Sequence, residues 1–473
     1  MLPSRHDAAR YQGKTMRFSL LSVTCLIILL PHPVPAQDTA ANTNIHSTAP
    51  NEFELRYVVY LSRHGVRSPT GKADLFNRYS TAAWPSWPVQ PGYLTPHGFH
   101  LMEIFGAFDR AQLATQGLLP ASGCAGASHV TIYADSDQRT RETGKAIAQG
   151  LMPSCDLTVQ SLPEGTNDPL FHPHPGSNVS AAQDAPLAKA AIAGRIGNDP
   201  ANLTRAYYPQ IAALDHILAT CGNGPASANP TSQRTSLMDI PATLSEGTGD
   251  HLAELRGPLS TSATLSENLL LEYAEGMDEA NVGWGCVHHA ELEELLALHT
   301  ASVDLGQRTP QIARAQASNL LQSIRQSIQQ AADQKSMRGA IGKPSDRALF
   351  LIGHDTNQEN IAGLLNLTWM IDGRRDDTPP GGALIFELWR NRTGEEFSVR
   401  TYFTAQTLDQ MRSSEPLTLS NPPQRVAVFI PGCSRADMSC PLASFLRVLE
   451  QASEPPVVPQ RHFPRNGAPG KDE

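Results

Sequence analysis

The sequence predicts an α/β fold, a mixed sheet flanked by helices with an inserted, mostly α-helical domain. Short apolar segments rich in β-branched and aromatic residues, each followed by a helical segment, occur near both ends of the chain, at 55–61, 130–134 and 348–352. The middle has helical periodicity instead, over 181–218, 265–277 and 290–332. Strand–helix units therefore bracket a helical block.

The individual elements follow from periodicity and composition. Strands are expected at Leu55–Leu61, Val130–Ala134, Ala348–Ile352, Ala383–Arg390 and Phe397–Phe403, and helices between them at His100–Gln112, Gln138–Leu151 and Gln358–Leu365. Residues 221–250 are dense in Gly, Pro, Ser and Thr, which predicts a long loop.

These elements predict how the chain divides into domains. We expect an α/β domain made of residues 53–175 and 300–450, interrupted by an α-helical domain at 176–299. Residues 453–473 are rich in proline and polar residues, which is typical of a flexible tail.

The N-terminus has the pattern of a secretory signal peptide. Arg17 precedes a short apolar run over 18–30, and Val34-Pro35-Ala36 offers small residues for cleavage after Ala36. The apolar run is too short to span a bilayer comfortably. Residues 1–36 are therefore predicted to be removed, and the mature protein to be periplasmic or secreted, without membrane attachment.

Composition and charge exclude some classes of protein. Hydrophobic residues make up 40% and charged residues 18% of the 473 residues, as in globular proteins with a buried core. The net charge of −9 becomes more negative once the basic signal peptide is removed. A protein this acidic is not expected to bind nucleic acid, and any anion site must be built locally.

Cysteine usage agrees with export. Six of the seven cysteines lie outside the signal peptide, and an even number in an exported chain predicts disulfides. Six cysteines allow 15 pairings, although the short separation of Cys433 and Cys440 favours that pair. The cysteine spacings do not resemble a zinc site.

Three strand-to-helix junctions carry polar clusters. They read RHGVRSPT from Arg63 to Thr70, DSDQRT from Asp135 to Thr140, and GHDTN from Gly353 to Asn357. In an open α/β sheet, ligands bind at the carboxyl ends of the strands. The three junctions are therefore expected to form one site.

Arginines and histidines in these junctions suit a phosphate group. Guanidinium groups of Arg63, Arg67 and Arg139 can give charge-assisted hydrogen bonds to a tetrahedral dianion. Nearby positive charge keeps the imidazole of His64 neutral and nucleophilic. Isolated arginines of this kind are usually surface ion pairs, but three beside histidines at strand ends favour an anion site.

Asp355 is the candidate for proton transfer. The leaving oxygen of a phosphate ester needs a proton, and a carboxyl group beside a bound anion can supply it. This role predicts an acidic pH optimum, because carboxyl groups normally titrate at low pH. Asp355 and Thr356 both suit the N-cap of a helix, so a capping role can coexist with chemistry.

The paired motifs RHGVRSPT and GHDTN resemble the histidine acid phosphatases, branch two of the histidine phosphatase superfamily. The resemblance covers nearly all of the mature chain and is closest to the bacterial periplasmic phytases, through segments such as WPSWP, YLTPHG, NDPLF, GWG and DDTPPGGALIFELWR. It implies disulfides between Cys124 and Cys155 and between Cys433 and Cys440. Cys221 and Cys286 are then left to pair with each other.

The resemblance also implies a role for each matching residue. His64 would accept the phosphoryl group and Asp355 would protonate the leaving oxygen. The phosphate-binding residues would be Arg63, Arg67, Arg139 and His354, and the substrate-binding residues Thr70, Lys72, Asp135, Glu267 and Thr356. Neither a metal nor another cofactor is implied, because the arginines already neutralise the phosphate.

The substrate class follows from the same resemblance, with alternatives left open. HDT at the third junction resembles phytases, whereas glucose-1-phosphatases tend to have HDS. However, phytase-like enzymes tend to have lysine directly after the Thr of the first motif, where this chain has Gly71 and then Lys72. We expect a monomer that hydrolyses phosphomonoesters, phytate in particular; a broad acid or sugar phosphatase and a non-catalytic binder of phosphorylated ligands are the alternatives.

Overall fold

The computed structural model describes residues 52–173, 181–222, 234–248, 251–394 and 396–453, which belong to one compact unit. The predicted signal peptide lies outside these residues, and so does the predicted tail apart from Ser453. Within the described part of the chain, the helices are too short or too polar to cross a bilayer.

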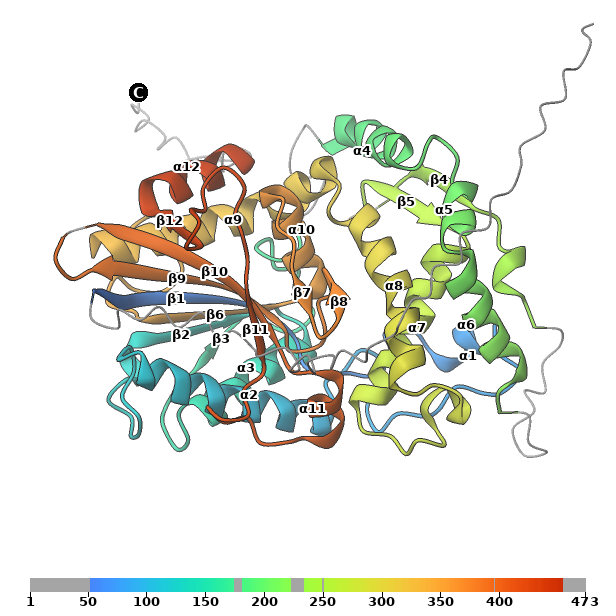
Figure 1. The fold of residues 1–473 in the computed structure, drawn as a ribbon, viewed down its shortest axis with the longest axis horizontal. Coiled ribbons are helices and arrows are strands. Elements are labelled where there is room, and N and C mark those ends of the chain that lie inside the picture. The colour runs from blue at the N-terminus through green and yellow to red at the C-terminus, as the bar shows by residue number, and fades with distance from the viewer. Residues whose placement is uncertain (1–51, 174–180, 223–233, 249–250, 395, 454–473) are drawn as a thin grey trace, which may run out of the picture. The chain divides into compact units, whose positions relative to one another are not determined.

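One mixed sheet forms the centre of the α/β part (Figure 1). Its strand order is β11-β10-β9-β1-β6-β2-β3, and β12 also pairs with β10. β1 (Phe53–Arg63), β6 (Ala348–Gly353), β2 (Val130–Ala134) and β3 (Val159–Gln160) are parallel neighbours. The other strands, all antiparallel to their neighbours, are β9 (Ala383–Asn391), β10 (Phe397–Ala405), β11 (Gln424–Ala427) and β12 (Ser439–Pro441).

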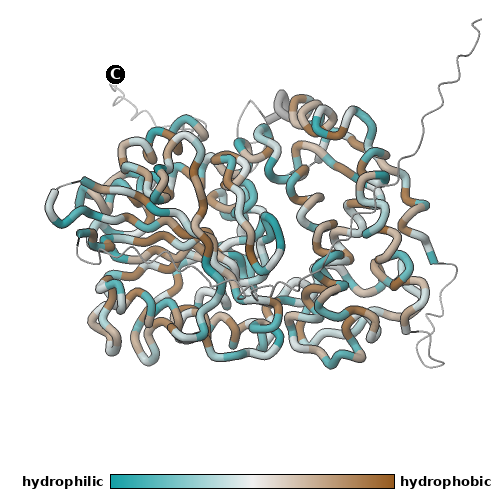
Figure 2. Tube along the Cα trace, viewed as in Figure 1, coloured by the Kyte–Doolittle hydropathy of each residue, from teal (hydrophilic) through white to brown (hydrophobic). Residues whose placement is uncertain are grey.

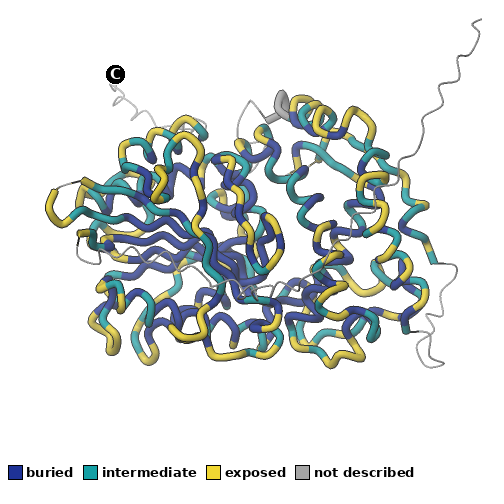
Figure 3. Tube along the Cα trace, in the orientation of Figure 1, coloured by how far each residue is buried: buried dark blue, intermediate teal, exposed yellow. Residues whose placement is uncertain are grey.

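Helices cover both faces of this sheet (Figure 1). α2 (Pro96–Thr115) and α3 (Gln138–Leu151) pack on one face, in a core that includes Val58 and Tyr60 of β1. The other face is covered by α9 (Pro310–Asp333), α10 (Asp355–Leu365) and α12 (Leu442–Ala452), against Val59 and Leu61. Because β1 is covered on both faces, it is apolar along most of its length and buried (Figures 2 and 3).

A second, mostly helical part lies between β3 and α9 in sequence. It contains α4 (Ala181–Arg195), α5 (Ala201–Ala206), α6 (Tyr208–Thr220), α7 (Pro258–Ala274) and α8 (His289–Gly306). Leucines and isoleucines of these helices share a core with Val66 and Trp84, which follow β1 in sequence. The predicted fold class is therefore confirmed. The predicted boundary between residues 299 and 300 falls inside α8, and the division into domains stays a prediction.

Several elements differ in extent from the expectation. The predicted long loop over 221–250 contains strand β4 (Thr243–Glu246), which pairs with β5 (Ala253–Arg256). α10 begins at Asp355 and not at Gln358, because Asn357 Oδ1 accepts a hydrogen bond from the His354 backbone amide at 2.9 Å. The remaining short elements are α1 (Ala73–Asn77), α11 (Leu408–Ser413) and the β7–β8 hairpin (Met370–Ile371, Arg374–Arg375).

Three disulfides connect the chain. Cys124 is bonded to Cys155, Cys221 to Cys286, and Cys433 to Cys440. All three expected pairs are confirmed. Cys221 ends α6 and Cys286 lies shortly before α8, so this bond ties two helices of the helical part together.

Candidate active site

The three polar junctions meet at one edge of the sheet. Arg63 at the end of β1 is opposite Gly353 at the end of β6, and Ala134 at the end of β2 is opposite Ile352. Parallel pairing therefore brings the residues after each strand together, as the sequence predicted. The backbone amide of His64 donates to the Gly353 carbonyl at 3.0 Å, which fixes the first junction against the third.

His64 is buried and held in one tautomer. Its Nδ1 lies 2.8 Å from the Gly65 carbonyl oxygen, which can only accept, so Nδ1 carries the proton and Nε2 has a free lone pair. Burial lowers the pKa of His64 well below its usual value, and Arg139, Arg67 and Arg63 lower it further. The ring is therefore neutral and nucleophilic at Nε2.

Gly65 is required by a close approach. A Cβ at this position would lie 2.8 Å from Met102 Cγ and 2.9 Å from the Gly98 carbonyl oxygen, both on α2. The Gly65 amide also donates to Thr143 Oγ1 at 3.0 Å. The loop that carries His64 is thus seated directly on α2 and α3.

Arg63 and Arg67 share a carboxylate from the helical part. Glu267 Oε1 on α7 accepts from Nη2 of Arg63 and from Nη2 of Arg67, the latter at 3.1 Å. Arg63 is 1% exposed, and its Nη1 donates to the Thr378 carbonyl at 2.6 Å. Buried guanidinium groups need such partners, and a bound phosphate would offer oxygens of the same kind.

Asp355 is the second carboxylate on Arg63. Asp355 Oδ2 lies 3.1 Å from Arg63 Nη2, and its Oδ1 accepts from the Thr356 amide at 2.7 Å. Burial would raise the pKa of Asp355, but Arg63, His299 and Arg67 hold it well below its usual value. Asp355 is therefore ionised in the unliganded protein, which the reasoning from sequence did not anticipate.

His354 and Arg139 form a second group around Asp135. His354 Nε2 donates to Asp135 Oδ2 at 2.7 Å, and Arg139 Nη2 lies 3.3 Å from His354 Nδ1. His172 Nε2 donates to the same Asp135 oxygen at 3.0 Å, and Arg139 is ion-paired with Asp137 at 2.6 Å. The His64 and His354 rings are 5.6 Å apart, so the two groups adjoin.

Thr70, Lys72 and Thr356 lie at the margin. A Cβ at Gly92 would be 3.6 Å from Thr70 Cγ2 and 3.7 Å from Arg139 Nη1, so Thr70 is close to the phosphate-binding group. Lys72 is exposed directly before α1, and the ion pairs of the described residues do not include it. Thr356 is half-buried, in the first turn of α10 next to Asp355.

Two histidines of the site were missed from sequence. His172 directly follows the NDPLF segment, so its proximity to a recognised motif was a usable signal. His299 lies on α8, 3.9 Å from Glu267 Oε2 and 4.0 Å from Asp355 Oδ2. Its only local signal was a histidine in an apolar helix, which is usually structural.

Ligand atoms that could hold a cation are already engaged. Among the described residues, Asp135, Asp137, His172 and His354 form one group of such atoms, and Glu267, His299 and Asp355 form another. In both groups the carboxylates also face arginines, Arg139 in the first and Arg63 in the second. The arginines favour an anion over a cation at this edge.

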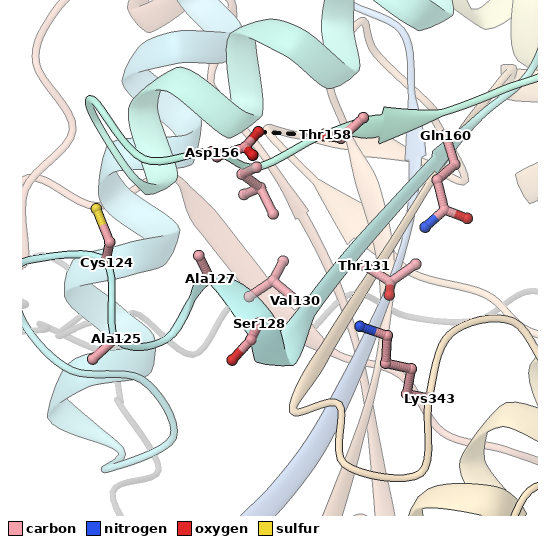
Figure 4. Close-up of a pocket in the computed structure, with 11 residues that line it drawn as sticks. Cys124, Ala125, Ala127, Ser128, Val130, Thr131, Asp156, Thr158, Gln160 and Lys343 are labelled. Atoms are coloured by element: carbon pink, nitrogen blue, oxygen red, sulfur yellow. Dashed lines mark hydrogen bonds between the residues drawn. The ribbon is translucent and has the colours of Figure 1, made fainter.

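A separate hollow lies at the opposite end of the sheet (Figure 4). Its volume is about 580 Å³, and its walls include Val130 and Thr131 at the start of β2 and Asp156 to Thr158 before β3. Lys343 is the one basic residue in its lining, and its side chain lies near Thr131 (Figure 4). It lacks the clustered arginines and histidines found at the carboxyl ends of the strands.

The fold and this site define the class of protein. The chain belongs to the histidine phosphatase superfamily (branch 2), which it matches over residues 54–221 and 260–404.

Its relatives include phytases and glucose-1-phosphatases. The chain is 37% identical to phytase AppA of Escherichia coli (strain K12), over 85% of this chain and 93% of the relative. It is 29% identical to a glucose-1-phosphatase of Salmonella typhimurium (strain LT2), over 93% of this chain and all of the relative. A solved structure of Hafnia alvei phytase in complex with tartrate superposes with a TM-score of 0.76 at 37% identity, covering 86% of this chain and 99% of that one.

Proposed function

We propose that this protein hydrolyses phosphomonoesters through a phosphohistidine at His64, with phytate as its principal substrate. The observation that carries the proposal is the free Nε2 of His64, fixed by the Nδ1 hydrogen bond and surrounded by three arginines. Such a nitrogen is nucleophilic, and the arginines are placed to neutralise a phosphoryl group.

The first half-reaction transfers the phosphoryl group to the protein. Arg63, Arg67, Arg139 and His354 bind the phosphate oxygens, and His64 Nε2 attacks phosphorus. The bond between phosphorus and the ester oxygen breaks, and Asp355 gives its proton to that oxygen, so an alcohol leaves.

The second half-reaction releases phosphate. A water molecule attacks the phosphorus of phosphohistidine and gives a proton to the Asp355 carboxylate. The phosphorus–nitrogen bond breaks, and the electron pair returns to Nε2. His64 and Asp355 are then both restored to their starting protonation states.

Phytate as substrate is supported by the two phytase relatives and by Thr356 in the third junction. A sugar phosphate is the second candidate, because the chain is also similar to glucose-1-phosphatases and has Gly71 after Thr70. Export is supported by the three disulfides, which persist in oxidising compartments.

The test is phosphate release by the purified protein at acidic pH. Phytate, glucose 1-phosphate and p-nitrophenyl phosphate are compared by kcat/KM, with His64→Ala as the inactive control. A preference for phytate is expected. Comparable values for all three would replace phytate with a broad substrate range, and activity retained by His64→Ala would remove the phosphohistidine.

A further inference from the structure

His299 occupies an unusual position between two carboxylates. It projects from α8 with a side chain 9% exposed, Nδ1 3.9 Å from Glu267 Oε2 and Nε2 4.0 Å from Asp355 Oδ2. Its Nε2 is buried, and among the described residues it has no hydrogen-bond partner. Burying a ring nitrogen without a hydrogen-bond partner costs free energy. A histidine that carries such a nitrogen beside the proposed proton donor is therefore expected to have a role.

The unliganded protein presents a difficulty for the proposed proton donor. Asp355 must be protonated to help an alkoxide leave, yet Arg63 and its neighbours keep the pKa of Asp355 low. Substrate binding changes this balance, because phosphate oxygens compete for the Arg63 guanidinium now 3.1 Å from Asp355. Once Arg63 turns to the phosphate, Asp355 needs a different partner and a proton.

We propose that His299 is a positioning residue that acts through Asp355, by holding a proton between Glu267 and Asp355 and delivering it to Asp355 when substrate binds. This inference rests on the proposed function. The imidazolium Nε2–H bond breaks as the proton moves to Asp355 Oδ2, which leaves a neutral imidazole and a neutral carboxylic acid. A shift of about 1 Å closes the 4.0 Å gap to hydrogen-bond length.

The surroundings of His299 favour a proton held at this place. α7 presents Glu267 and α10 presents Asp355; Arg63 is ion-paired with both carboxylates, and Arg67 with Glu267. A cation placed between two buried carboxylates reduces their mutual repulsion.

Among the described residues, the ion pairs of His299 are with these two carboxylates. α4 and α6 contribute aliphatic side chains to the core that holds the leucines of α8. β5 contributes Leu255 to the same core, and Arg374 of β8 is ion-paired with Asp372 and Asp377.

The test uses His299→Gln, which keeps a polar side chain but cannot carry the proton. The matched control is His289→Gln on the same helix, where the histidine is ion-paired with Asp409 and Glu293 instead. Steady-state kcat is measured from pH 3 to pH 8 on an alkyl phosphate and on p-nitrophenyl phosphate. Thermal melts report whether each variant folds, and His299→Asn replaces His299→Gln if the latter does not.

The expected result is a loss that depends on the leaving group. For His299→Gln, kcat on the alkyl phosphate falls by about 10-fold or more and its decline with rising pH moves to lower pH. On p-nitrophenyl phosphate, whose phenolate leaves without a proton, kcat changes less than about threefold. In an Asp355→Asn background the same substitution has no further effect, because His299 acts through Asp355.

Three outcomes would overturn the inference. Equal losses on both substrates with an unchanged pH profile would make His299 a purely structural residue. A wild-type protein inactive on both substrates would remove the proposed function and this inference with it, whereas an active wild type with an unaffected His299→Gln would remove the inference alone.

Discussion

His64 and Asp355 lie beside the same arginines, which shift the two pKa values in the same direction. Arg63 and Arg67 lower the pKa of His64 and so keep the proposed nucleophile neutral. They also lower the pKa of Asp355, which keeps the proposed proton donor ionised until a ligand arrives. We therefore expect phosphate binding to favour protonation of Asp355, because the phosphate and the Asp355 carboxylate compete for Arg63.

Replacing Asp355 separates proton donation from phosphate binding. In Asp355→Asn, we expect kcat on an alkyl phosphate to fall by roughly 100-fold or more, because the alkoxide leaves without a proton. The kcat on p-nitrophenyl phosphate should fall far less, since a phenolate is a good leaving group. Rates on both substrates at one acidic pH check this, and an equal loss on both would assign Asp355 to binding.

Among the single residues of the site, those next to strand ends could be predicted from the sequence. His64, Arg67, Asp135 and Asp355 lie where a parallel sheet must bring them together. His299 could not be found in this way, because its position depends on how α8 packs against α7 and α10. Nor could the ionised state of Asp355, which depends on a 3.1 Å approach by Arg63.

Among the elements, α2 contacts the loop after His64 most directly. A Cβ at Gly98, in the first turn of α2, would lie 2.1 Å from the Val66 carbonyl oxygen, so backbone meets backbone. The Thr95 amide donates to the same carbonyl at 3.1 Å. The start of α2 and the loop after His64 therefore form one rigid contact.

Adding a methyl group at this contact should displace the loop. For Gly98→Ala we expect destabilisation of about 1–3 kcal/mol and a clear loss of kcat, because neither backbone segment can yield easily. Gly194→Ala in α4 is the control, since a Cβ there meets nothing within 4 Å. Urea denaturation and kcat measure both, and equal effects in the two variants would contradict the close contact.

The longer elements could be predicted from their strong periodicity, whereas the shorter ones have local patterns too weak for prediction. The bounds of β2 and α3 agree with the expectation, because an apolar strand and an amphipathic helix are defined by their own residues. β3, with two residues, and β12, with three, are strands only because a neighbouring strand pairs with them. Such pairing is a tertiary event that local composition does not encode.

At the scale of the whole molecule, four carboxyl groups with raised pKa values make the fold more stable at acidic than at neutral pH. Burial raises the pKa of Asp109 and of Glu272 to about 8, and that of Glu275 and of Glu359 to about 7. Each group keeps its proton in the folded protein at pH values where the unfolded chain has lost it. The stabilisation is complete below about pH 4 and is lost as pH rises through 7 to 8.

The free energy of unfolding should therefore fall between pH 5 and pH 8. Glu272→Gln mimics the protonated acid and keeps an oxygen for the Gly283 amide, so we expect it to reduce this fall by on the order of a few kcal/mol. Glu294→Gln, at an exposed position on α8, should leave the fall unchanged. Chemical denaturation at both pH values checks this, and an unaltered pH dependence in Glu272→Gln would contradict it.

In the proposed mechanism, the hydrogen bond from His64 Nδ1 to the Gly65 carbonyl also sets which ring nitrogen is phosphorylated. With Nδ1 occupied, the phosphoryl group can enter only at Nε2, so the trapped species is the tele isomer of phosphohistidine. Phosphoramidates of this kind hydrolyse in acid. The acidic conditions in which we expect activity are therefore those in which the intermediate of the denatured protein hydrolyses, so trapping has to end in an alkaline quench.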